Sequence, residues 1–179
     1  YKVPTDRIIY ENYIFELHEN NLRNTAGEEI NASFSFGFIS EKVKSETFFS
    51  NVNAKNGFFA NAHGLEVRSS SIDYDRSNRD VDLPYHRVNH FKVTNNTTLY
   101  LDQHILELDF GYQNNQRDEN SEPVPHGYMP TPSNSRERIF TKNTYSLNLK
   151  DTFSPNDKHN VVLGINTELQ NNNIGGWGF

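Results

Sequence analysis

The clearest pattern in this chain is a strict alternation of apolar and polar positions between Ile30 and Phe38. The apolar positions are Ile30, Ala32, Phe34, Phe36 and Phe38, and the positions between them hold Asn, Ser, Ser and Gly. Successive side chains of a β-strand point to opposite faces. The stretch therefore predicts a strand with one apolar, aromatic face and one small, polar face.

Similar alternation recurs along most of the chain, whereas the spacing typical of amphipathic helices is hard to find. The third stretch is the least regular, because Phe48 and Phe49 are adjacent. We predict an all-β fold, an antiparallel up-and-down meander of about seven long strands within one segment spanning residues 1–179. The predicted strands are Arg7–His18, Glu29–Ser40, Ser45–Asn53, Val88–Leu101, His104–Asn114, Thr141–Phe153 and Lys158–Gln170. From the fourth strand on, the rows predicted to share one face are Phe91, Val93, Thr97, Leu99 and Leu101, then Leu106, Leu108, Phe110 and Tyr112, then Tyr145, Leu147 and Leu149, then Val161, Leu163, Ile165 and Leu169.

The connections between these strands alternate in length. Short turns are predicted at 41–44, 102–103 and 154–157, a medium loop at 19–27, and long loops at 54–87 and 115–140, the last rich in proline. In a meander this order sends every long loop to one rim, as in outer-membrane barrels. Residues 30–38 are about 26 Å long and, tilted by about 40°, cover about 20 Å, close to the ~25 Å apolar band of such barrels. The pattern favours part of a transmembrane β-barrel over a β-sandwich, which can show the same alternation.

Composition narrows the class of protein. Only 34% of the residues are hydrophobic, the mean hydropathy is -0.80, and no apolar run approaches the roughly 18 residues of a membrane-spanning helix. The aromatic fraction of 13% is high for so polar a chain and argues against disorder. A net charge of -6 without a run of Lys and Arg disfavours nucleic acid as a partner. The absence of Cys excludes disulfides and thiolate sites.

Two stretches carry a family resemblance: GFFANAHGLEV at 57–67 and DVDLPYHRVNHFKV at 80–93. Together with LDFGYQNN at 108–115, they resemble the barrel region of TonB-dependent outer-membrane receptors of the Bacteroidota type. The resemblance implies a 22-stranded barrel with an N-terminal plug, which imports a scarce nutrient such as a ferric siderophore across the outer membrane of a Gram-negative bacterium.

The chain departs from that family pattern, since it shows about seven strands, no plug, no energy-coupling box and no closing C-terminal strand. We therefore expect a partial barrel segment. The partners implied are outer-membrane lipid, a small-molecule or metal-chelate substrate, and a TonB-type energy-coupling complex that would be reached through the missing plug. The resemblance implies no enzymatic activity and no cofactor.

The long loops hold the candidate ligand-binding residues, since loops of this size are commonly functional. These residues are His63, Asp73, Asp75, Asp80, Asp82 and His86 in the first long loop and Tyr128 in the second. Carboxylates and imidazoles could hold a cation or a ferric chelate, but the Asp73 spacing fails the EF-hand pattern, with Asn78 in place of Gly and Pro84 in place of Glu. The structural alternative is that Asp75 and Asp80 form ion pairs with loop arginines, and we expect no metal centre.

Two other functions stay open at this point. A secreted β-sandwich could bind carbohydrate or metal through its loops, with its aromatic rows facing one another in a core. A small outer-membrane hydrolase would need its His and Asp residues to meet a Ser hydroxyl, because proton transfer requires hydrogen-bond reach. No Gly-x-Ser-x-Gly elbow supports the hydrolase.

Overall fold

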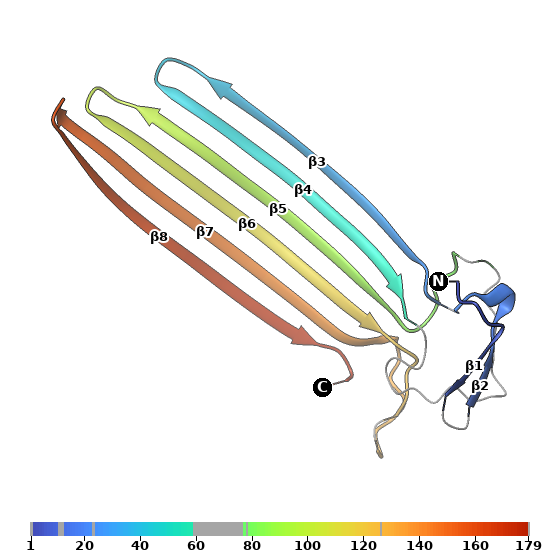
Figure 1. Ribbon diagram of the computed structural model, residues 1–179. Coiled ribbons are helices and arrows are strands. Elements are labelled where there is room, and N and C mark those ends of the chain that lie inside the picture. Colours follow the sequence, from blue (N-terminus) through green and yellow to red (C-terminus); the bar gives the residue numbers. More distant parts are fainter. Residues whose placement is uncertain are drawn as a thin grey trace.

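The computed structural model describes residues 2–10, 13–22, 24–58, 77, 79–125 and 127–178. Its main feature is one open, six-stranded antiparallel sheet in which neighbours in sequence are neighbours in space (Figure 1). The strands are β3 (Gly27–Ile39), β4 (Val43–Gly57), β5 (Tyr85–Tyr100), β6 (His104–Asn120), β7 (Arg136–Asn156) and β8 (His159–Gly175). The all-β, up-and-down meander predicted from the alternation is confirmed, with six strands in the sheet.

The segment predicted as a first long strand does not join this sheet. It forms a separate two-stranded sheet of β1 (Arg7–Tyr10) and β2 (Tyr13–Glu16), followed by a short 3-10 turn, η1 (His18–Asn20). The register pairs Tyr10 with Tyr13, so the chain reverses between them. The prediction of a single strand from Arg7 to His18 is wrong because the two arms of a hairpin show the same period of two as one long strand.

The register gathers the predicted apolar rows on one face of the sheet. One such row across all six strands is Phe34, Phe49, Val93, Tyr112, Tyr145 and Leu169. We call this side the Phe34 face and the opposite side the Ser35 face. The rings of Phe34 and Phe49 stack with their centroids 4.7 Å apart, while Phe48 belongs to the Ser35 face. The irregular Phe48–Phe49 step is therefore an ordinary alternation with an aromatic residue on both faces.

The Phe34 face changes character along the strands. Near the tight turns it is apolar, and the apolar band consists of Ile30, Ala32, Phe34, Phe36, Phe38, Phe49, Phe91, Val93, Leu99, Leu106, Leu108, Phe110, Tyr112, Tyr145, Leu147, Leu149, Val161, Leu163, Ile165 and Leu169. Nearer the long loops the same face carries uncharged amides, and the amide zone consists of Asn51, Asn53, Asn89, Asn114, Gln116, Asn143, Asn171 and Asn173. On β4 to β8 the Phe34 face thus changes from apolar to amide side chains within a continuous backbone ladder.

Within the described residues, no second layer covers the apolar face. Leu17 is the one buried hydrophobic side chain in the described residues, whereas Phe34, Phe36 and Phe38 are 60–62% exposed. The outer edges of β3 and β8 pair with no other strand in the part of the chain that the structure describes. A soluble domain of this length normally buries a core, so this sheet presents to its surroundings the apolar surface that such a domain would hide.

The connections separate by length, as predicted. The β3–β4, β5–β6 and β7–β8 turns lie at one end of the sheet. The strand ends that the two long connections join, Gly57 and Tyr85 in the first and Asn120 and Arg136 in the second, lie at the other end (Figure 1). Leu101 and His104 exchange two backbone hydrogen bonds of 2.9 and 3.3 Å, which confirms the minimal turn at 102–103. No helix of the described residues has the length and apolar character needed to cross a membrane.

Both long loops are shorter than predicted. β4 continues to Gly57 and β5 begins at Tyr85, so the predicted loop 54–87 loses residues at both ends. In the same way β6 runs to Asn120 and β7 starts at Arg136, inside the predicted loop 115–140. The strand extensions are polar, and polar segments lack the apolar alternation that marks a strand in a sequence.

Candidate functional site

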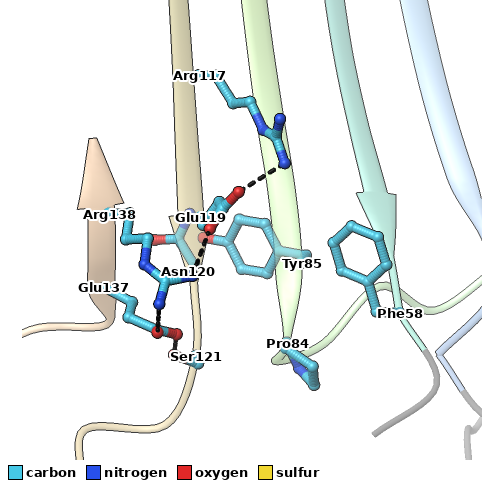
Figure 2. Close-up of a pocket in the computed structure, with 9 residues that line it drawn as sticks. All are labelled: Phe58, Pro84, Tyr85, Arg117, Glu119, Asn120, Ser121, Glu137 and Arg138. Carbon is cyan, nitrogen blue, oxygen red and sulfur yellow. Dashed lines mark hydrogen bonds and ion pairs between the residues drawn. The ribbon is translucent and has the colours of Figure 1, made fainter. Parts of the chain in front are cut away.

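A pocket of about 140 Å³ lies at the loop end of β5, β6 and β7. Its lining residues are Phe58, Pro84, Tyr85, Arg117, Glu119, Asn120, Ser121, Glu137 and Arg138. Figure 2 shows an apolar side made by Phe58, Pro84 and Tyr85 opposite a charged side from β6 and β7. The register between β6 and β7 shifts at Glu119 and Asn120, and such irregularities redirect side chains at the ends of sheets.

The charged side of the pocket is a network centred on Glu119. Its carboxylate meets Arg117 Nη2 at 2.5 Å and Arg138 Nη1 at 3.3 Å. Arg138 also approaches Glu137 at 3.5 Å, and Glu137 accepts a hydrogen bond from the Ser121 hydroxyl. Ion pairs with side chains this exposed contribute about 0–1 kcal/mol each to stability. These pairs bring two guanidinium groups to the same carboxylate at the loop end of the sheet.

His86 stands beside this network, five residues beyond Phe91, where the apolar band of β5 ends. Its Nε2 lies 3.2 Å from the amide nitrogen of Asn56, and its ring packs on Phe58 with centroids 4.7 Å apart. Burial lowers the pKa of His86 from its usual 6.5, the positive charge of Arg117 lowers it further, and Glu119 opposes the change. The Nδ1 atom is buried and has no hydrogen-bond partner in the described residues.

Asn24 fixes the base of the first long loop. Its side-chain nitrogen donates to the carbonyl oxygens of Phe58 at 2.9 Å and Pro84 at 2.7 Å, and its side-chain oxygen accepts from the backbone nitrogen of Asp82 at 2.8 Å. Asn24 is 3% exposed and has a left-handed backbone with φ of 55°, which Asn tolerates better than most residues. One side chain therefore joins the segment before β3 to both ends of the β4–β5 connection.

The structure places only some of the predicted ligand-binding residues. His63, Asp73 and Asp75 lie outside the described residues. The Asp80 carboxylate accepts a hydrogen bond from the backbone nitrogen of Ser77 at 2.9 Å, a contact that stabilises a local turn. The Asp82 side chain is exposed. His86 adjoins the pocket, and Tyr128 is fully exposed in the second long loop, away from the pocket lining.

The residues that line the pocket were not predicted as site residues from the sequence. Arg117, Glu119, Glu137 and Arg138 fell in a predicted loop because their strand segments carry runs of successive charged residues and few apolar ones. A usable signal was the proline distribution: the prolines of that loop lie between 123 and 132 only, which leaves room for strands up to Asn120 and from Arg136.

The two histidines of β5 have side-chain amides as neighbours. The ring of His90 lies 3.3 Å from the Gln113 side-chain oxygen, and His86 contacts the Asn56 amide, so both histidines have amide neighbours. Within the described ranges no three His, Asp or Glu side chains form a group that could hold a metal ion. Comparison of the chain with protein-family profiles, curated proteins and solved structures found no match.

Proposed function

We propose that this sheet is a section of the wall of an outer-membrane β-barrel, and that the protein takes part in TonB-dependent import of a small molecule or metal chelate. The observation that carries the proposal is the apolar band, which is exposed on one face of a sheet whose other face is mainly polar. Burying a Phe or Leu side chain contributes about 1.5–3 kcal/mol relative to leaving it in water. Lipid would supply that burial for the whole band.

The shape of the band supports a tilted strand in a barrel. The band is centred at Phe34 on β3 and at Ile165 on β8. Through the register, Ile165 aligns in turn with Leu149, Leu108, Thr97, Ser45 and Phe38. The centre therefore moves four residues, from Phe34 to Phe38, which is about 13 Å over five strand spacings totalling about 24 Å. The resulting inclination of about 30° approaches the tilt of about 35–45° found in membrane barrels.

The polar residues inside the band are also suited to an apolar environment. Asn95 donates to the hydroxyl of Thr47 at 2.8 Å and to that of Ser45 at 3.2 Å, and accepts from Thr97 at 2.8 Å. Ser45 and Thr97 are themselves 2.8 Å apart. An unpaired polar group in hydrocarbon costs several kcal/mol. This cluster satisfies its own groups on the Phe34 face, as lipid contact requires.

The open edges and the loops fit the same proposal. Unpaired backbone groups are excluded from hydrocarbon, so β3 and β8 would pair with further strands of a closed barrel. The long connections and the pocket then lie together at the substrate-facing rim. A β-sandwich would instead cover the Phe34 face with a second layer, and the described residues provide none.

Cysteine labelling tests the membrane assignment directly, because the chain has no natural Cys. Phe34→Cys and Leu147→Cys place a thiol on the Phe34 face, and Ser33→Cys and Ser146→Cys are matched neighbours on the Ser35 face. In lipid vesicles we expect a membrane-impermeant maleimide to label the second pair and spare the first. Equal labelling of both pairs, or a monodisperse and cooperatively melting monomer without detergent, contradicts the proposal.

Import is tested in the producing bacterium. Deleting the coding sequence is expected to abolish proton-motive-force-dependent growth on at least one scarce iron or nutrient source. Restoring the full-length protein should recover growth, and a protonophore should block uptake again. Growth that is unchanged across iron-limited and nutrient-limited media contradicts an import function while leaving the membrane assignment to the labelling experiment.

A further inference from the structure

The Ser35 face carries a concentration of positive charge near the loop end, in a chain with a net charge of -6. Four cations lie on this face, Lys92 on β5, Arg117 on β6, and Arg138 and Lys142 on β7, and we call these four side chains the cationic patch. Lys92 is level with Gln113 and Thr144, two residues from the level of Lys142. The four cations are far apart in sequence, so they do not form a run of basic residues along the chain. In an antiparallel sheet, Arg117 lies diagonal to both Arg138 and Lys142, at a Cα spacing of about 7–8 Å.

Acidic side chains balance only part of this charge. Glu119 pairs with Arg117 and Arg138, and Glu137 also contacts Arg138. Lys92 and Lys142 are exposed and form no ion pair within the described residues. Four cations against two carboxylates leave a net charge of +2.

We propose that the cationic patch and the adjoining pocket bind a small organic anion that has a flat apolar part. Guanidinium and ammonium groups recognise carboxylate, sulfonate or phosphate groups through charge-assisted hydrogen bonds. The apolar side of the pocket, formed by Phe58, Pro84 and Tyr85, offers contact for a ring. That this surface faces a water-filled barrel interior rests on the proposed function, whereas its preference for anions follows from the charges alone.

The binding test uses the full chain in a neutral detergent, with pyrenetetrasulfonate, a flat aromatic tetra-anion, as the probe. Fluorescence anisotropy is expected to show saturable binding that weakens as salt rises from about 0.1 M to about 1 M, because the screening length falls from about 10 Å to about 3 Å. Inorganic phosphate should compete, and the flat cation proflavine should not. Absence of saturable binding, or equal competition by proflavine, overturns the inference.

Matched charge variants locate the site. The double variant Lys92→Gln with Lys142→Gln is expected to weaken probe binding about tenfold. The control, Lys44→Gln with Lys150→Gln, removes the same charge from the same face at the tight-turn end and should change binding by less than about twofold. Equal weakening by both doubles means that only net charge matters and overturns the inference.

A variant with the opposite expected sign guards against misfolding. Glu119→Gln removes the carboxylate shared by Arg117 and Arg138, so probe binding should tighten by about threefold. Tighter binding cannot arise from a sheet that fails to form, and circular dichroism checks the strand content of every variant. Unchanged or weaker binding by this variant contradicts the assigned site. Labelling that fails while the probe binds would refute the membrane proposal alone, and the reverse result would refute this inference alone.

Discussion

The two ends of the sheet share one backbone ladder and differ in almost everything else. At the tight-turn end, two- and three-residue connections join strands whose Phe34 face is apolar. At the loop end, the same face carries the amide zone, and the Ser35 face carries most of its positive charge. Backbone pairing therefore continues in the same way through both halves of a strand. The side chains decide which environment each half can occupy.

The largest expected effect comes from placing a charge in the apolar band. Leu147→Arg should lower the free energy of unfolding in lipid vesicles by about 2–4 kcal/mol, the range for Arg at the middle of a bilayer. Asn143→Arg makes a similar change four residues nearer the loops on the same strand and face, and should cost about 0–1 kcal/mol. Denaturant titration of refolded protein measures both. Equal costs would erase the distinction between the apolar band and the amide zone.

The next effect concerns the loop end alone. Asn24→Ala removes three buried or part-buried hydrogen bonds, to Phe58, Pro84 and Asp82, which should cost about 2 kcal/mol. Hydrogen exchange should accelerate at Gly57 and Phe58 and stay unchanged at the 102–103 turn. Asn31→Ala, on the exposed strand β3, is the control and should leave exchange at the loop base unaltered. Acceleration at both ends would mean that the ends are one cooperative unit.

A glycine substitution tests the packing at the loop base and should have a smaller effect. A Cβ at Gly57 would lie 2.5 Å from the backbone oxygen of Asn24, so Gly57→Ala should cost about 1–2 kcal/mol through overpacking. At Gly164, on β8, the nearest atom to a Cβ is 3.5 Å away, and Gly164→Ala should be nearly neutral. Thermal or denaturant midpoints in detergent compare the two. Similar midpoints would show that the loop base can rearrange.

The smallest effect concerns the pKa of His86, at the loop end of β5. The proton resonances of His86 should titrate with a midpoint below 6.5, with Arg117→Gln raising the pKa and Glu119→Gln lowering it further. Because the folded state disfavours protonated His86, the free energy of unfolding should fall as pH drops below about 6.5. His86→Gln should remove that component of the pH dependence. A midpoint above 6.5 would place a net negative field at the site.

Sequence alone predicted the tight-turn end better than the loop end. Rows such as Leu106, Leu108 and Phe110 alternate cleanly, and the register confirms that they share a face. The first predicted strand is a hairpin in the structure. The sequence did not predict the reversal of the chain, because both arms of a hairpin show the same period of two. At the loop end, charged strand segments around Arg117 and Arg138 looked like loop. The cationic patch could not be foreseen, since it depends on the register between three strands and not on any local run of residues.

Asn24 has a consequence for how the β3–β4 hairpin is assembled. The tight turn after Ile39 closes one end of this hairpin, and the Asn24 side chain, together with the Gly57–Ala26 backbone hydrogen bond, ties the opposite end. A strand held at a single end can slip by one residue, and such a slip would turn every Phe of β3 from one side of the sheet to the other. Because β3 is anchored at both ends, it can pair with β4 in one register only. The Asn24 side chain thereby helps to keep the Phe residues of β3 on one face of the sheet and the polar residues on the other.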